Sequence, residues 1–152
     1  MFQDLLLLAA AATCALATRY GSAPERVLTT AFLGNLLLEE GCAVLIGREF
    51  STEHFSVYFA LELSLLILFC AVALRANRVY PLWLGGGQII AIAAHVLLQV
   101  LGREARAACE WIDACASLVQ LVALTVGLSA HRSRQLRLGR RYPDWTATAN
   151  SH

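Results

Sequence analysis

Five runs of apolar residues follow one another along this chain of 152 residues, and short polar stretches separate them. About 20 apolar residues in helical conformation cross the hydrocarbon core of a bilayer. The pattern therefore predicts an all-α integral membrane bundle with five transmembrane helices, over residues 5–18, 23–47, 53–76, 80–102 and 107–130. The first run is short for a span and needs a thin bilayer or the residues before it.

Polar residues between the runs mark where the predicted helices begin. Ser22, Pro24 and Glu25 combine a hydroxyl cap, a proline in the first turn and a glutamate three residues after the cap. This combination is a signature of a helix start. Ser51 or Thr52 can cap the third helix in the same way. The connections between the predicted spans are therefore short.

The composition agrees with a membrane protein. The chain is 58% hydrophobic and 15% charged, with a mean hydropathy of +0.59, which is too apolar for a soluble domain of this size. All basic residues are arginine, and the absence of lysine excludes a retinal-type Schiff base and a lysine-dependent phosphate loop. We expect one transmembrane domain over residues 1–131 and an arginine-rich cytoplasmic tail over residues 132–152.

The arginines predict the orientation of the bundle. Nine fall on one side of the predicted topology and three on the other, and cytoplasmic loops of membrane proteins carry the excess of basic residues. The N-terminus is therefore predicted outside and the C-terminus in the cytoplasm. The nine are Arg19, Arg26, Arg75, Arg78, Arg132, Arg134, Arg137, Arg140 and Arg141, and the three are Arg48, Arg103 and Arg106.

Ionisable residues lie inside four of the predicted spans, at similar distances from their outer ends. With a rise of ~1.5 Å per residue, Glu39 and Glu62 lie roughly 12 Å deep. By the same measure, His95 and Asp113 lie roughly 9 to 10 Å deep. The candidate residues for binding an ion or a ligand are Glu39, Glu40, Glu62, His95, Gln99 and Asp113.

Burial of these groups requires compensation. An acid or base at mid-membrane costs ~2.5 to 3.5 kcal/mol, so three isolated carboxylates could cost on the order of 10 kcal/mol. Helix neighbours recur at three and four residues, so Gln99 shares a face with His95. If such polar faces meet, they form a pocket that a shared proton, a cation, water or a small ligand would stabilise. The same residues could instead serve only as hydrogen bonds between helices.

Other interpretations use the same residues. Candidate ligands for a divalent metal are Glu39, Glu62, His95 and Asp113, with Cys42 or Cys115 as a sulfur donor, although no diagnostic spacing is present. A haem clamp of His95 and His54 needs a shifted helix boundary, because His54 lies roughly 10 Å shallower. A membrane enzyme or redox protein could use His95 with Glu62 or Asp113 as acid and base. A purely structural scaffold subunit is the remaining alternative.

Two further features lie near the predicted membrane surfaces. Cys42 and Cys109 are predicted near the oxidising outer face, so a disulfide between them is an open alternative. The arginines of the tail are expected to contact anionic lipids of the inner leaflet. No aromatic or fold signature supports nucleic acid binding. The expected partners are therefore membrane lipids and other copies or subunits of a membrane complex.

Part of the chain resembles small multi-pass proteins of bacterial inner membranes, in the residues Leu74, Arg75, Ala76, Asn77, Arg78, Pro81, Leu82, Trp83, Gln88 and His95. The resemblance implies an inner-membrane setting and no particular activity. We therefore expect a non-enzymatic multi-pass inner-membrane protein, an oligomer or a subunit of a larger complex. Its bundle is expected to hold a polar site for a proton, a cation or a small ligand.

Overall fold

The computed structural model describes residues 2–46, 55–76 and 78–138, and all regular structure within them is helical. The elements are α1 (Phe2–Tyr20), α2 (Ala23–Ile46), α3 (Phe55–Arg75), α4 (Tyr80–Leu101), the short 3-10 turn η2 (Gly102–Ala105) and α5 (Arg106–Leu138). The predicted all-α fold is confirmed for these residues.

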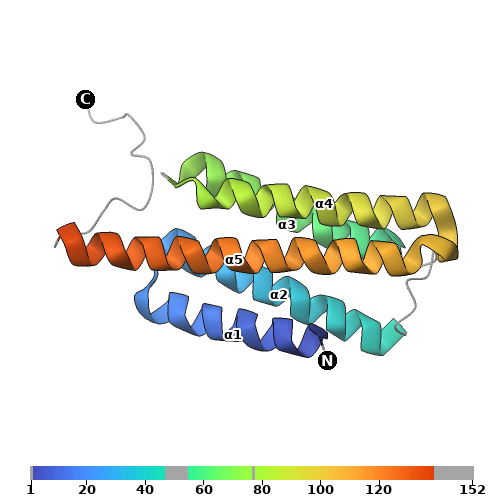
Figure 1. Cartoon of the computed structure of the whole chain (residues 1–152), viewed down its shortest axis with the longest axis horizontal. Helices are drawn as coiled ribbons and strands as arrows, with labels where there is room; N and C mark the ends of the chain where they lie inside the picture. Colours follow the sequence, from blue (N-terminus) through green and yellow to red (C-terminus); the bar gives the residue numbers. More distant parts are fainter. Residues whose placement is uncertain (1, 47–54, 77, 139–152) are drawn as a thin grey trace.

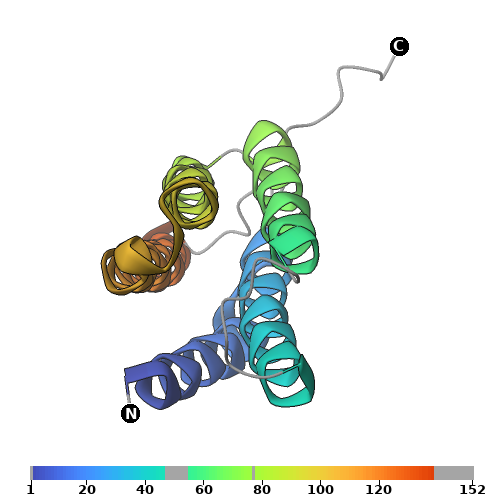
Figure 2. The ribbon, with the colours of Figure 1, turned by 90° about the vertical axis from the view of Figure 1, so that its right-hand side faces the viewer.

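Successive helices run in opposite directions along a common axis (Figure 1). The most extensive contacts join α4 to α5 and α3 to α4, whereas α1 packs mainly on α2. Viewed from the end, α4 and α5 lie together on one side of the bundle, and α2 and α3 lie on the other, with α1 beside α2 (Figure 2). One end of the bundle therefore holds the last residues of α1, α3 and α5 and the first residues of α2 and α4.

Four of the described helices, α2 to α5, are long and apolar enough to cross a membrane. The helix α1 is not among them, and its apolar stretch lies between Asp4 and Arg19. Between these residues the stretch extends only about 20 Å at ~1.5 Å per residue, against a hydrocarbon core of roughly 30 Å. The structure thus supports a membrane-embedded helical protein with four candidate spans, and the fifth span stays a prediction.

The helix boundaries lie within a few residues of the predicted ones, except at the end of α5. This helix continues to Leu138, past the predicted end at Ala130. The exposed residues Arg132, Arg134 and Arg137 thus lie on a continuous helix, where the sequence predicted a tail. Seven residues named above lie outside the described residues: Arg48, Ser51, Thr52, His54, Asn77, Arg140 and Arg141.

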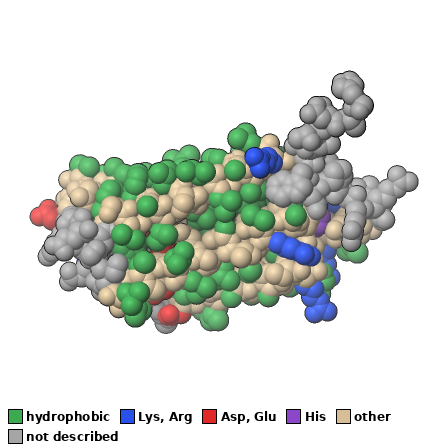
Figure 3. All heavy atoms as spheres, turned by 180° about the vertical axis from the view of Figure 1, so that it is seen from behind, with side chains coloured by type: hydrophobic (Ala, Val, Ile, Leu, Met, Phe, Trp, Pro, Cys, Tyr) green, Lys and Arg blue, Asp and Glu red, His purple; other side chains and the backbone are tan. Residues whose placement is uncertain are grey.

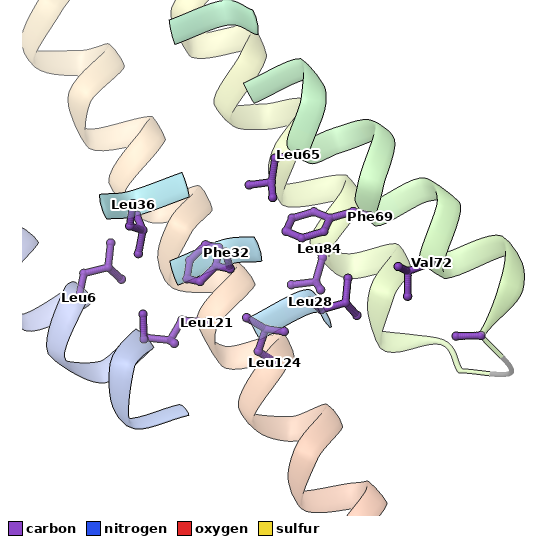
Figure 4. Packing of buried hydrophobic residues seen from close by; sticks show 12 residues of the cluster. Leu6, Leu28, Phe32, Leu36, Leu65, Phe69, Val72, Leu84, Leu121 and Leu124 are labelled. Carbon is purple, nitrogen blue, oxygen red and sulfur yellow. The ribbon is translucent and has the colours of Figure 1, made fainter. Parts of the chain in front are cut away.

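Buried apolar side chains fill the middle of the bundle (Figure 4). Phe32 of α2, Phe69 of α3, Leu84 of α4 and Leu124 of α5 are all almost fully buried in this cluster. Leu6 adds a contribution from α1. Because lipid tails are as apolar as these side chains, the cluster stabilises a membrane bundle through close van der Waals packing more than through removal from water.

Charged residues are segregated to the two ends of the bundle. Arginines gather toward one end and acidic side chains toward the other (Figure 3). Apolar side chains cover much of the surface between them, as expected where helices face lipid. The predicted gathering of arginines is present in the described residues, and their placement in the cytoplasm stays a prediction.

Candidate functional site

The acids of α2 and α3 meet inside the bundle. Glu62 is buried and Glu39 is half-buried, and their carboxyl groups are close electrostatic neighbours. Asp113 of α5 is an electrostatic neighbour of both. Glu39 Oε1 also accepts a hydrogen bond of 2.7 Å from Asn35 Nδ2, one helical turn earlier. Three carboxyl groups from three helices therefore share one site, which we call the acid cluster.

Two buried glutamines connect Glu62 to α4 and α5. Gln88 Nε2 donates to the Glu62 carboxylate and, at 3.2 Å, to the Glu62 backbone carbonyl. Gln120 Nε2 donates to Gln88 Oε1 at 2.7 Å and to the carbonyl of Leu84 at 3.3 Å. Both glutamines are at most 2% exposed, so their amides must find partners inside the protein. The Oε1 atom of Gln88 accepts the hydrogen bond from Gln120, so the Nε2 atom of Gln88 faces Glu62. Glu62 is therefore the hydrogen-bond acceptor of this pair.

Gly87 makes room for this chain of hydrogen bonds. A Cβ atom at Gly87 would lie 2.7 Å from Cγ of Gln120, whereas one at Gly85 or Gly86 would meet nothing within 4 Å. A side chain at position 87 would therefore push Gln120 away from Gln88. The helix α4 is continuous through all three glycines.

His95 adds an imidazole to the acid cluster from α4. Its side chain is buried, and Nδ1 lies 3.0 Å from the backbone oxygen of Ala91. A carbonyl oxygen only accepts hydrogen bonds, so Nδ1 must carry the hydrogen. Asp113 is an electrostatic partner of His95. The remaining ring nitrogen, Nε2, is therefore the atom of His95 that can take up or release a proton.

The structure brings together four of the six predicted site residues: Glu39, Glu62, His95 and Asp113. Glu40 is half-buried on α2, where Tyr58 of α3 lies near it. Gln99 is exposed and does not belong to the buried cluster. It lies only two residues before the end of α4, where the helix face that carries His95 is no longer covered by its neighbours.

The amides that support the acids were not among the predicted site residues. Asn35, Gln88 and Gln120 are all buried. Helical spacing aligns each of them with a candidate residue, because Asn35 lies one turn from Glu39 and the two glutamines lie two turns from His95 and Asp113. Nothing in the sequence indicates that Gln88 and Gln120 contact each other, because that contact depends on the packing of α4 on α5.

The geometry does not support a metal centre in this cluster. Within the part of the chain that the structure describes, no group of three or more histidine, cysteine or acidic side chains could hold a metal ion. The cysteines are free thiols, so the open alternative of a disulfide between Cys42 and Cys109 is not present in this structure, and Cys115 is exposed. The second haem ligand that we considered, His54, lies outside the described residues.

A second buried polar cluster, at the arginine-rich end, was not predicted. Glu25 of α2 and Arg78, which precedes α4, form an ion pair with Glu25 Oε1 and Arg78 Nη1 3.4 Å apart, and their side chains are only 1% and 3% exposed. The other carboxylate oxygen of Glu25 accepts hydrogen bonds from the Ser22 hydroxyl and, at 3.1 Å, from the Ser22 amide. The helix-start signature explains the contact with Ser22 and does not indicate the ion pair.

Tyr80 and His131 extend this second cluster into α4 and α5. Tyr80 is an electrostatic neighbour of Glu25 and Arg78. Its ring packs on Gly127 of α5 so closely that a Cβ atom there would lie 2.7 Å from it. His131, one turn further along α5, is also buried. The predicted topology places Arg78 on the cytoplasmic side and gives it no partner inside the bundle.

The apolar core separates the two polar clusters. Along α2, Phe32 lies between Glu25 and Glu39, and along α4, Leu84 follows Tyr80 in the direction of the acid cluster. Both side chains are buried and belong to the packed centre of the bundle (Figure 4). The interior therefore consists of an acid cluster, an apolar layer and an ion-pair cluster.

The fold and the site define an all-helical, membrane-embedded bundle with carboxyl groups in its interior. A scan against protein-family models, a search of curated proteins and a search of solved structures each gave no match to this chain. The resemblance to bacterial inner-membrane proteins therefore stays an expectation. What the protein does must be argued from its own residues.

Proposed function

We propose that this multi-pass membrane protein binds a proton inside its bundle, at the carboxyl pair of Glu39 and Glu62. The observation that carries the proposal is that two carboxyl groups from different helices are close neighbours inside the bundle. An ionised carboxylate only accepts hydrogen bonds, so two adjacent carboxyl groups can bond to each other only when one of them holds a proton. Two negative charges in contact would also repel strongly in the low dielectric of the interior.

The surrounding hydrogen bonds favour Glu39 as the residue that carries the proton. Gln88 donates to the Glu62 carboxylate, and a donated hydrogen bond stabilises the ionised form of an acid. Asn35 donates to Glu39 Oε1, which leaves Oε2 of Glu39 to hold the proton. The pair would then carry one negative charge, located mainly on Glu62.

His95 and Asp113 supply a path for proton exchange. Asp113 lies in the second turn of α5, close to the acidic end of the bundle, and is a neighbour of both His95 and Glu62. A proton arriving at this end can bind His95 Nε2 or Asp113 and then reach the carboxyl pair. Because the apolar layer lies between this site and Glu25, the site exchanges protons with one side only in this conformation.

Infrared difference spectroscopy on proteoliposomes during acidification tests the proposal. The wild-type protein is expected to show the carbonyl stretch of a buried protonated carboxyl, and Glu39→Gln should remove it. Glu62→Gln should remove or shift the same band, because the partner of the proton is lost. Glu110→Gln is the matched control, since Glu110 is an exposed acid that pairs with Arg106. A band that is identical in wild type and both interior variants would refute the proton site.

A further inference from the structure

Two arginines from distant parts of the chain lie over one tyrosine ring at the arginine-rich end. The guanidinium carbon of Arg132, on α5, lies 4.6 Å from the centroid of the Tyr20 ring. That of Arg19, at the end of α1, lies 5.5 Å from the same centroid. Cations are attracted to the face of an aromatic ring. Tyr20 therefore holds two guanidinium groups near each other, at the junction of α1 and α5.

Arg26 brings a third guanidinium to this place from α2. Its Nε donates a hydrogen bond of 3.1 Å to the carbonyl of Gly21, in the turn between α1 and α2. The turn is tightly packed, because a Cβ atom at Gly21 would lie 2.6 Å from the backbone oxygen of Ala17. Arg26 is thus anchored through Nε, and its terminal amino groups can bind another acceptor.

No acid of the described chain forms an ion pair with Arg19, Arg26 or Arg132. The nearest acid in the sequence, Glu25, is buried and already bound to Arg78. Its charge is therefore not available to the exposed arginines. The opposite end of the bundle differs, since Arg106 pairs with an acid on its own helix.

The three arginines lie where the membrane surface is expected. Candidate spans begin or end at this level, since α2 starts at Ala23 and the apolar part of α5 gives way to exposed arginines after His131. The phosphate groups of a bilayer lie just outside its hydrocarbon core. A guanidinium offers paired N–H donors that match two oxygens of a phosphate.

We infer that Arg19, Arg26 and Arg132 form a binding site for the headgroup phosphate of an anionic phospholipid, with Tyr20 as the platform for two of them. The bound lipid joins α1, α2 and α5. It thereby fastens the α1–α2 hairpin to the rest of the bundle at this end. This inference does not depend on the proton site, which lies on the other side of the apolar layer.

Native mass spectrometry of the full chain, purified with phosphatidylglycerol or phosphatidylcholine, tests the site. The wild-type protein is expected to retain phosphatidylglycerol in preference to phosphatidylcholine. Arg132→Gln should weaken phosphatidylglycerol binding roughly fivefold, the usual effect of one basic residue at a membrane surface. Tyr20→Leu should also weaken binding, although it leaves the charge of the chain unchanged.

Two controls distinguish this site from general attraction between charges. Arg106→Gln removes one positive charge at the other end and should leave phosphatidylglycerol binding as in the wild type. Inorganic phosphate added to the lipid complex should not displace the lipid, because free phosphate lacks the acyl chains that anchor the headgroup. Equal lipid retention by Arg132→Gln, Tyr20→Leu and Arg106→Gln would overturn the inference, and so would displacement by inorganic phosphate.

Discussion

At the scale of single residues, the interior of this protein depends on polar side chains that find partners on other helices. Gln88 and Gln120 illustrate this, because both are buried and every described contact of their amides joins different helices. Hydrogen bonds between membrane helices contribute only ~0.6 kcal/mol on average. The main effect of the two glutamines is therefore to orient the donor that faces Glu62, with a smaller effect on stability.

Gly87→Ala tests this arrangement at a single position. The added Cβ would lie 2.7 Å from Cγ of Gln120, and crowding of this kind typically costs about 1 to 3 kcal/mol. We expect a lower free energy of unfolding in a reversible detergent titration and a shift of the infrared carboxyl band. Gly86→Ala is the matched control, since a Cβ there meets nothing within 4 Å. Equal stability of the two variants would contradict the close packing of Gly87 on Gln120.

At the scale of helices, polar contacts hold the α1–α2 hairpin against the other three helices at both ends. Glu39 meets Glu62 at one end, and Glu25 meets Arg78 at the other. The two contacts differ physically, because the first joins two acids, which we propose share a proton, and the second is an ion pair. Loss of the proton would therefore loosen the hairpin at the acidic end and leave the ion pair intact.

Glu25→Gln tests the ion pair as a connection between helices. Removal of one partner of a buried pair leaves an uncompensated charge and typically costs about 3 to 5 kcal/mol. Unfolding followed by tryptophan fluorescence should show a loss of this size. Glu110→Gln breaks a partly exposed pair and should cost less than about 1 kcal/mol. Replacement of both Glu25 and Arg78 by leucine should destabilise less than Glu25→Gln; a larger loss in the double variant would argue against this account.

At the scale of the whole molecule, the alternating helices place the arginines at one end and the acid cluster toward the other (Figures 1 and 3). An excess of basic residues on the cytoplasmic side orients membrane proteins. With the predicted orientation the acid cluster would lie toward the extracytoplasmic side, and the proposed lipid site would face the inner leaflet. The orientation thus decides from which side the proposed site receives its proton.

Reporter fusions in a bacterial host test this orientation. A reporter that is active only in the cytoplasm should be active when fused after Leu138. The same reporter should be inactive when inserted in the connection between α2 and α3. A reporter that is active only outside the cytoplasm should give the opposite pattern. Reversed results would place the acid cluster toward the cytoplasm and contradict the predicted topology.

The sequence by itself determined the class of the protein and the positions of its helices. Apolar runs, caps and arginine placement are local signals, and a chain inside a bilayer must satisfy its backbone hydrogen bonds within each helix. The same signals identified Glu39, Glu62, His95 and Asp113 as residues at one depth. They also showed that the first apolar run is short for a span, but they did not anticipate that α5 continues to Leu138.

The tertiary structure alone decided which of these residues meet. The rotation and the register of one helix against another follow from the packing of whole helix faces, and no short stretch of sequence encodes either. For this reason the pairing of Glu39 with Glu62 and the contact of Gln120 with Gln88 emerged only from the folded bundle. The same is true of Glu25 and Arg78, because the partners of a buried charge are set by the three-dimensional fold.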